Sequence, residues 1–289
     1  MKHTRKWLAA ALALVLALAL AVPAFAAAVT WEKMAEGNSV LAPEDAYTPE
    51  SAQKALDAYQ KYNDAKRGSQ EEKDIYNNEF RPAILALAFK AHQFTDAPHG
   101  QWYDKALDYV YSTGKMNGVG QGSFDPQGTM TRAMAVTILW RMNGEPAAKK
   151  APGFSDVPAG QWYTGAVAWA VENKITNGVS ATSFAPDTPV TREQMACFFS
   201  RMILALAGQN PDTKISEAVA RPALAKQYSD AAKISTYALT HVLLCLEAEV
   251  MKGNADGTFA PQANITRAQG AQMLLNYYNT LLSNTFRKL

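Results

Sequence analysis

A segment that occurs three times in this chain constrains its fold more than any other sequence feature. The first copy runs from Phe94 to Met142, and the second runs from Phe154 to Met202, 60 residues later. A third and more divergent copy runs from Tyr228 to Tyr277. A unit of this size buries little apolar surface by itself, so the three copies are expected to pack against one another.

Each copy predicts two helices joined by a glycine-containing turn and an irregular loop. The first helices are expected over residues 103–113, 163–173 and 237–249. The second helices are expected to begin at three threonines, each followed by arginine: Thr131, Thr191 and Thr266. Residues at positions +3, +7 and +10 from each arginine form one apolar helical stripe. In each loop a phenylalanine two residues before a proline is expected to anchor the chain in the core: Phe124, Phe184 and Phe259.

The sequence outside the repeats predicts further helices and leaves little room for strands. Helices are expected from Val29 to Gly37, from Thr48 to about Gly68, and from Ser69 to about His92 with a break at Pro82. Another is expected around 215–224, between the second and third copies. We therefore predict a mostly α fold in which three helix–loop–helix units have a pseudo-threefold arrangement. A helical prefix precedes them, either packed on the repeats or spacing away from them.

The first 26 residues have the pattern of a secretory signal peptide. Three cations precede an apolar run, and Ala24-Phe25-Ala26 supplies small residues for cleavage. An uncleaved membrane anchor is the alternative, because the apolar run is nearly long enough to span a bilayer. We expect cleavage, which predicts a secreted protein with no membrane segment.

The charge balance predicts no nucleic-acid partner. The chain has 28 Lys and Arg and 26 Asp and Glu, and three of the cations (Lys2, Arg5 and Lys6) belong to the signal peptide. The remaining 25 cations, 28 less 3, face 26 acids, so no net field recruits nucleic acid or anionic lipid. Cys197 and Cys245 lie in apolar helical runs, which predicts buried free thiols; the alternative is a disulfide, which export permits.

The Thr-Arg pair at the start of each second helix is the most informative chemical feature. Threonine is a helix N-cap, and a glutamine at N3, as in Gln194 and Gln269, completes a capping box; Met134 does not. The arginine stands in the first turn, where the helix dipole disfavours a cation, so its recurrence indicates a compensating partner. The guanidinium and the first-turn N–H groups would together bind a planar anion such as a carboxylate. The alternatives are that the arginine bonds the aspartate of the turn that opens a neighbouring copy, the entry turn (Asp96, Asp156 or Asp230), or that it is merely solvated.

Taken together, F-x-D, W-Y, a helix, a glycine turn, F-x-P and Thr-Arg resemble the surface-layer homology (SLH) motif. The three copies cover residues 94–278, nearly two thirds of the chain. The resemblance implies a three-repeat helical domain that binds secondary cell-wall polysaccharide, or a peptidoglycan-linked glycan, non-covalently. The predicted organisation is a signal peptide over 1–26, the prefix over 27–92, and SLH repeats over 93–144, 153–204 and 227–280.

The resemblance also assigns the candidate ligand-binding residues. In that family the grooves between repeats hold a sugar with a pyruvate ketal, and the arginine of a TRAE motif meets its carboxylate. By position this role falls to three residues of this chain: Arg132, Arg192 and Arg267. The entry-turn aspartates and two tryptophans are expected to shape the grooves: Asp96, Asp156, Asp230, Trp102 and Trp162. This chain departs from the pattern because Met134, Gln194 and Gln269 replace the glutamate of TRAE. The alternative for the tryptophans is a role as core plugs.

No motif predicts catalysis, a metal or a cofactor. His92, His99 and His241 match no metal-ligand spacing, which favours solvated or structural histidines. We therefore predict a non-catalytic wall-anchoring protein, with self-assembly possible. One alternative is a wall-associated carbohydrate-active enzyme that uses acids of the prefix (Glu71, Glu72 and Asp74), although these residues are typical of a first helical turn. The other is a protein-assembly module whose grooves hold acidic side chains.

Overall fold

The computed structural model describes residues 30–36, 38 and 40–287, and the predicted signal peptide lies outside them. The prefix contains four α-helices: α2 (Trp31–Ala35), α3 (Pro49–Asp64), α4 (Gln70–Ile75) and α5 (Arg81–Leu85). The repeats contain α6 (Asp104–Ser112) with α7 (Arg132–Met142), α8 (Thr164–Glu172) with α9 (Arg192–Leu206), and α11 (Leu239–Glu247) with α12 (Arg267–Thr285). The additional helix α10 (Glu217–Ala225) precedes the third repeat. The described residues contain isolated β-bridges but no named strand, which confirms the mostly α prediction.

The second helix of each repeat begins as the sequence predicts. The side chains of Thr131, Thr191 and Thr266 each accept a hydrogen bond from the amide three residues later. Gln194 and Gln269 bond back to the amide of their N-cap threonine and complete the two expected capping boxes. Each cap contributes about 1 kcal/mol. The predicted core stripe is also confirmed, because its members are buried or packed against the core.

The three repeats meet at a closed ring of backbone hydrogen bonds. The residue before each N-cap threonine takes part: the Met130 amide donates to Ile265 O, the Ile265 amide donates to Val190 O, and the Val190 amide donates to Met130 O, at 2.8, 3.1 and 3.0 Å. All three side chains are fully buried. Gly270 lies beside this ring, and a Cβ atom there would overlap the sulfur of Met130. The ring fixes the starts of all three second helices about one pseudo-threefold axis.

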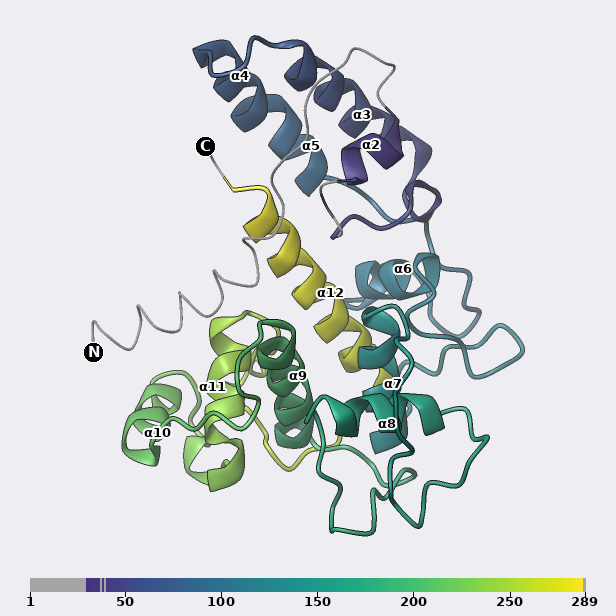
Figure 1. The fold of residues 1–289 in the computed structure, drawn as a ribbon, viewed down its shortest axis with the longest axis vertical. Coiled ribbons are helices and arrows are strands. Elements are labelled where there is room, and N and C mark those ends of the chain that lie inside the picture. The colour runs from purple at the N-terminus through teal and green to yellow at the C-terminus, as the bar shows by residue number, and fades with distance from the viewer. Residues whose placement is uncertain (1–29, 37, 39, 288–289) are drawn as a thin grey trace.

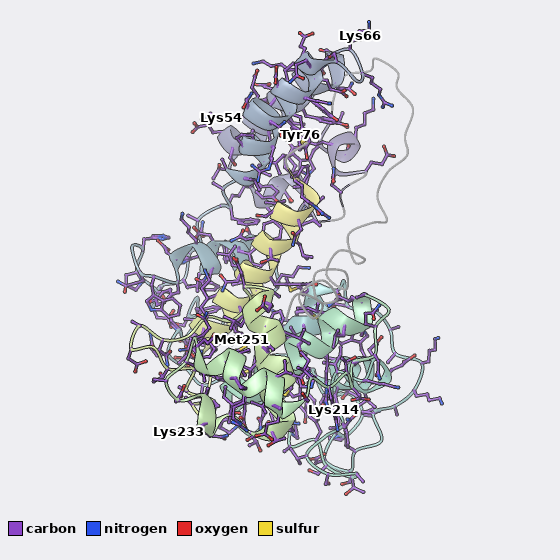
Figure 2. All side chains as sticks on the ribbon, turned by 90° about the vertical axis from the view of Figure 1, so that its left-hand side faces the viewer. Lys54, Lys66, Tyr76, Lys214, Lys233 and Met251 are labelled. Atoms are coloured by element: carbon purple, nitrogen blue, oxygen red, sulfur yellow. The ribbon has the colours of Figure 1, made fainter. Side chains whose placement is uncertain are left out.

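The prefix rests on the far end of α12, which runs out of the repeat body along the long axis of the molecule (Figure 1). Figure 2 shows the same arrangement from the side, with Tyr76 in the prefix and Met251 in the body. The hydroxyls of Tyr47 and Tyr278 are 2.6 Å apart, and Arg81 Nε donates to Phe286 O at 2.7 Å. The prefix is therefore packed on the repeats through α12.

The third prefix helix is shorter than the sequence predicts. The expected helix from Ser69 to about His92 begins correctly, because the Ser69 hydroxyl accepts the Glu72 amide. It passes through a π-helical turn at Tyr76–Phe80 just before Pro82, and α5 ends at Leu85. Residues beyond it are extended, and Phe89 forms a bridge with Tyr47. The prediction of helix to His92 was wrong because tertiary pairing with the Tyr47 segment replaces helical bonds there.

Two further expectations concern cysteines and membrane segments. Cys197 and Cys245 are free and buried, as predicted. Burial raises the pKa of the Cys197 thiol to about 12, so it behaves as a small apolar group. No helix within the described ranges has the length and apolar character needed to cross a bilayer.

Candidate functional site

Each of the three candidate arginines extends from one repeat into the loop of the next. Arg132 Nε donates to Phe184 O at 2.8 Å, Arg192 Nε to Phe259 O at 2.6 Å, and Arg267 Nε to Phe124 O at 2.6 Å. These bonds run from repeat 1 to 2, from 2 to 3, and from 3 back to 1. The arginine of every repeat therefore secures its neighbour, and the three contacts close a second ring around the axis.

The same phenylalanines cover the guanidinium groups. The guanidinium carbon lies 4.9 Å from the Phe184 ring centre for Arg132, 5.0 Å from that of Phe259 for Arg192, and 4.5 Å from that of Phe124 for Arg267. All three arginines are at most 6% exposed. Burial lowers the pKa of each guanidinium, but arginine remains charged at neutral pH. The compensation for a first-turn cation is therefore a carbonyl and an aromatic face of the next repeat.

The entry-turn aspartates hold the same loops from the other side. Asp156 accepts the amides of Phe184 and Ala185, both at 2.8 Å. Asp96 and Asp230 accept the corresponding amides of repeats 1 and 3. Burial alone would raise the pKa of Asp156, but the hydrogen bonds from the loop outweigh it and hold the pKa below its usual value. The carboxylates therefore reach from the start of each repeat to the loop that follows its first helix.

The aspartate thus accepts the amide N–H of the loop phenylalanine, and the arginine donates to the carbonyl oxygen of the same residue. Among the described residues no ion pair joins Arg132, Arg192 or Arg267 to any carboxylate. The alternative of direct Arg–Asp pairing between repeats was therefore wrong. The three guanidinium charges have no carboxylate partner within the described structure.

The first-turn N–H groups are not available for a ligand, contrary to the sequence-based expectation. The amides of Arg132 and Ala133 donate to Thr188 O and Pro186 O, both at 2.9 Å. The equivalent amides of α9 and α12 donate in the same way to the loops of repeats 3 and 1. The N3 amide of each helix is taken by its threonine cap. Of the donors at the start of each second helix, only the guanidinium N–H groups remain available to an anion.

The junction between repeats 1 and 2 differs from the others in the second nitrogen of its arginine. We call this contact junction 1–2, defined by Arg132, Ala133 and the Phe184 loop. In the other two junctions the Nη2 atom has a carbonyl partner, Lys252 O for Arg192 at 2.9 Å and Asn117 O for Arg267 at 2.7 Å. The Nη2 atom of Arg132 is buried and has no partner. A buried donor left unpaired costs about 1–3 kcal/mol, so a hydrogen-bond acceptor placed at this atom would be stabilising.

The glycine turn of repeat 2 has a different backbone conformation from the glycine turns of repeats 1 and 3. Asn177 occupies the position that Asn117 and Lys252 hold in the other repeats. The next residue, Gly178, has φ of 77°, while Gly118 and Gly253 lie outside the left-handed region. The Gly178 amide bonds the Thr176 hydroxyl at 3.2 Å. A turn with this different backbone path does not offer its Asn177 carbonyl to Arg132.

The junction between repeats 2 and 3 is filled by a carboxylate of the chain itself. We call it junction 2–3, defined by Arg192, Glu193 and the Phe259 loop. Glu193 is 2% exposed and accepts the Ser235 amide at 3.0 Å and, at 2.8 Å each, the Ser235 hydroxyl, the Tyr237 hydroxyl and the Gln262 amide. Partial desolvation of its hydroxyl, and then the bond to Glu193, raise the pKa of Tyr237, so this phenol stays protonated and donates. Repeats 1 and 3 have alanine at the position of Glu193: Ala133 and Ala268.

The two predicted tryptophans lie at the surface. Trp102 is 58% exposed and Trp162 is 56% exposed, so the alternative that they plug the core was wrong. Each packs edge-on against the tyrosine that follows it. Tyr237 corresponds to them in repeat 3 and is 57% exposed. Every repeat therefore presents one exposed aromatic residue just before its first helix.

Comparison with known proteins places the repeats in a family. The model of the S-layer homology domain matches residues 93–135, 153–196 and 227–271. The chain carries three S-layer homology domains. It is 31% identical over 189 residues to the surface-layer 125 kDa protein of Lysinibacillus sphaericus, covering 64% of this chain and 15% of that protein. It is 30% identical over 184 residues to an endoglucanase of Bacillus sp. (strain KSM-635), covering 64% of this chain and 18% of the relative.

The relatives share the SLH repeats but differ in the rest of their chains. An amylopullulanase of Thermoanaerobacterium thermosulfurigenes matches over 173 residues with 26% identity, covering 60% of this chain and 9% of the enzyme. This chain thus spans less than a fifth of each of these three relatives. Because both surface-layer proteins and enzymes match it, the similarity concerns the SLH repeats and not one catalytic activity.

Two features of the SLH repeats escaped sequence reasoning. Glu193 is a buried carboxylate inside junction 2–3, and its only sequence signal is a charge where the other two repeats have alanine. A surface hollow of about 460 Å³ lies on repeat 3, lined by Gln227, Tyr228, Leu246, Glu249, Lys252, Gly253, Asn254 and Gly257. It contains none of the predicted ligand-binding residues. Its presence follows from the turn between α11 and the Phe259 loop.

Proposed function

We propose that this protein is a non-catalytic cell-surface anchor whose SLH repeats bind an acidic secondary cell-wall polysaccharide, with junction 1–2 as the carboxylate-binding site. The observation that carries the proposal is the buried, unpartnered Nη2 atom of Arg132. This guanidinium has no carboxylate partner in the described chain, and its Nε atom is held by Phe184 O. A sugar-borne carboxylate, such as a pyruvate ketal, supplies both the missing acceptor and the missing charge.

The residues around junction 1–2 favour a saccharide as the bearer of that carboxylate. Ala133 stands where Glu193 fills junction 2–3, so no side chain of this position competes for Arg132. Trp162, at the position corresponding to Tyr237, offers an exposed indole face of the kind that binds amphipathic ligands. In junction 2–3, by contrast, Glu193 takes four hydrogen bonds from the chain itself. The three junctions are therefore not equivalent in this proposal.

The contacts of the candidate acids of the prefix support a role in attachment. Glu71 and Glu72 lie in the first turn of α4, and Glu72 accepts the Gly68 amide at 2.6 Å. Asp74 accepts the side-chain amide of Gln70 at 2.9 Å on the same helix face. These contacts stabilise a helix N-terminus and its first turns.

Co-sedimentation with purified cell walls tests the proposal. The protein is expected to sediment with walls that retain the pyruvate ketal and to stay in solution with walls from which the ketal has been removed. Arg132→Ala is expected to weaken binding at least about tenfold, the value of one charge-assisted hydrogen bond. Arg141→Ala, on the same helix α7 and near its other end, is the matched control and should bind as the wild type does.

The alternatives give different results in the same experiment. Equal binding to both wall preparations contradicts recognition of the ketal. Binding that free pyruvylated saccharide does not compete away favours a protein-assembly module in which the junctions hold a partner's acidic side chains. Release of soluble sugar from the walls by the purified chain favours a wall-associated enzyme.

A further inference from the structure

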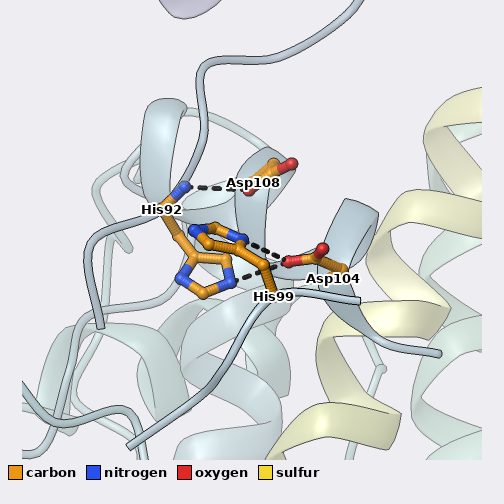
Figure 3. Close-up of side chains that lie close together, drawn as sticks. All are labelled: His92, His99, Asp104 and Asp108. Carbon is orange, nitrogen blue, oxygen red and sulfur yellow. Dashed lines mark hydrogen bonds and ion pairs between the residues drawn. The ribbon is translucent and has the colours of Figure 1, made fainter. Parts of the chain in front are cut away.

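Two histidines and two aspartates converge at the entry to repeat 1, although the sequence separates them (Figure 3). His92 lies at the end of the segment that leaves the prefix, His99 lies in the entry loop, and Asp104 and Asp108 lie one turn apart on α6. One ligand atom from each of the four side chains lies within 4.8 Å of all the others. The sequence spacing gave no sign of this cluster because the entry loop folds back over α6.

The inner atoms of the cluster already have the spacing of metal ligands. One oxygen of Asp104 lies 3.0 Å from His92 Nε2 and 2.9 Å from His99 Nδ1. Figure 3 shows both imidazole rings directed at this oxygen. Ligand atoms at about 2.0–2.1 Å from a tetrahedral zinc ion are about 3.3 Å apart. A cation would replace these hydrogen bonds by moving between the two ring nitrogens and the Asp104 oxygen, and Asp108 would complete the set, since the four ligand atoms all lie within 4.8 Å of one another.

Backbone amides hold both carboxylates in place. The other oxygen of Asp104 accepts the Gly100 amide at 2.8 Å, and Asp108 accepts the His92 amide at 2.8 Å. Hydrogen bonds of this kind, made by groups that do not themselves touch the metal, fix the orientation of metal ligands. Among the described residues, neither aspartate forms an ion pair with a lysine or an arginine.

The SLH fold itself does not require the cluster. In repeat 2 the four positions 60 residues later hold groups that are poor metal ligands: Pro152, Ala159, Thr164 and Ala168. There Thr164 closes the same entry loop with one hydrogen bond to Pro158 O at 2.8 Å. The helix that follows has 9 residues, as α6 has. Repeat 1 therefore carries four additional metal-binding side chains on a framework that forms without them.

We propose that His92, His99, Asp104 and Asp108 form a binding site for a divalent transition-metal cation of the zinc class. Two imidazoles and two carboxylates suit zinc, whereas calcium and magnesium prefer ligand sets made entirely of oxygen. His92 is 2% exposed and anchors the site, while His99 is largely exposed and gives the cation access from solvent.

Binding requires that His92 Nε2 and His99 Nδ1, the two ring nitrogens that now face Asp104, both offer a lone pair to the cation. Each neutral imidazole then carries its proton on its other ring nitrogen, so the long 3.4 Å contact from the Phe94 amide to His92 Nδ1 is lost. The cation then joins the end of the prefix segment to α6. The expected consequence is a more rigid connection between the prefix and the first SLH repeat, independent of any wall ligand.

The test is calorimetric titration of the untagged full chain with zinc, together with thermal unfolding in zinc and in calcium. Zinc is expected to bind with a stoichiometry of one and to raise the unfolding temperature, and calcium is expected to do neither. His99→Ala should weaken zinc binding by at least about tenfold. His99 is exposed, so this variant is expected to fold, and Asp187→Ala, which removes an exposed acid of repeat 2, is the control that should bind as the wild type does.

Cobalt supplies a spectroscopic readout of the same site. Cobalt bound by the wild type should give the visible absorption of a four-coordinate ion, and His99→Ala should lose it. If zinc does not bind to the folded wild type, or binds equally to His99→Ala, the four side chains are a hydrogen-bonded network only and the proposal is wrong.

Discussion

Junctions 1–2 and 2–3 contain the same Thr-Arg pattern, but they differ in whether the Nη2 atom of the arginine has a hydrogen-bond partner. In both, an arginine in the first turn donates Nε to a phenylalanine carbonyl of the next repeat and packs under its ring. In junction 2–3 the Nη2 atom is satisfied by Lys252 O, and Glu193 fills the space with a buried carboxylate. In junction 1–2 the Nη2 atom of Arg132 has no partner.

The geometry that the junctions share and the proposed capacity of a junction to bind a ligand are therefore separate properties. The Nε bond and the phenylalanine ring secure one repeat to the next in every junction. Only the residue after the arginine and the path of the glycine turn decide whether a donor remains for an external anion. A repeat can therefore keep its structural arginine and lose its ligand.

The largest expected effect on stability is at the carboxylate that fills junction 2–3. Glu193→Ala removes a buried carboxylate that accepts four hydrogen bonds, two of them from Ser235 and one from Gln262. We expect a loss of about 3 kcal/mol in the free energy of unfolding, measured by urea denaturation. Glu247→Ala, which removes an exposed acid of α11, should change it by less than about 0.5 kcal/mol. Equal effects of the two substitutions would mean that Glu193 does not hold the junction closed.

A buried histidine gives the interface between repeats 2 and 3 a pH dependence that the interface between repeats 1 and 2 lacks. His241 bonds Ser200 at 2.6 Å between α11 and α9, and Trp140 and Ala166 occupy the corresponding positions one repeat earlier. Burial lowers the pKa of His241 to about 4, below the value of about 6.5 in an unfolded chain. Between these two pH values the unfolded chain binds a proton that the folded chain does not. Stability is therefore complete above about pH 6.5 and falls as the pH drops toward 4.

The expected loss over this range is about 2–3 kcal/mol. It is measured as the free energy of unfolding at a series of pH values for the wild type and for His241→Asn. The variant should show a flatter profile between the same limits. If the two profiles run parallel, His241 is not the group responsible.

The smallest expected difference concerns the helix caps of the two junctions. Thr191 has a reciprocal capping box with Gln194, whereas Thr131 faces Met134, which cannot bond back. Thr191→Ala is expected to cost about 1–2 kcal/mol and Thr131→Ala about 0.5–1 kcal/mol. Thermal unfolding of both variants under one set of conditions gives the order. A larger loss for Thr131→Ala would show that the reciprocal bond adds nothing.

The sequence predicted the features that depend on local hydrogen bonds and on helical periodicity. The capped starts of α7, α9 and α12 follow from Thr-Arg, and the buried stripes follow from spacing. Phe124, Phe184 and Phe259 were recognisable because each precedes a proline in an irregular loop, and all three are at most 1% exposed.

The sequence did not predict features that depend on contacts between repeats. The partners of Asp156 lie 28 and 29 residues away, in a loop whose path is set by packing. The first-turn amides were expected to face a ligand, but neighbouring carbonyls take them. The cluster of His92 with His99 forms because the entry loop folds over α6, and no spacing rule describes that. Helix α5 ended early because pairing between Phe89 and Tyr47 replaced helical bonds.

The most direct test of the central claim is the affinity of a small pyruvylated saccharide for Arg132→Lys and Arg192→Lys, measured by calorimetry. Lysine keeps the positive charge but lacks the Nη2 atom and the planar fork. If the free donor of junction 1–2 binds the carboxylate, Arg132→Lys should lose at least about tenfold in affinity and Arg192→Lys less than about threefold. Equal losses in both variants, or an unchanged affinity in Arg132→Lys, would contradict it.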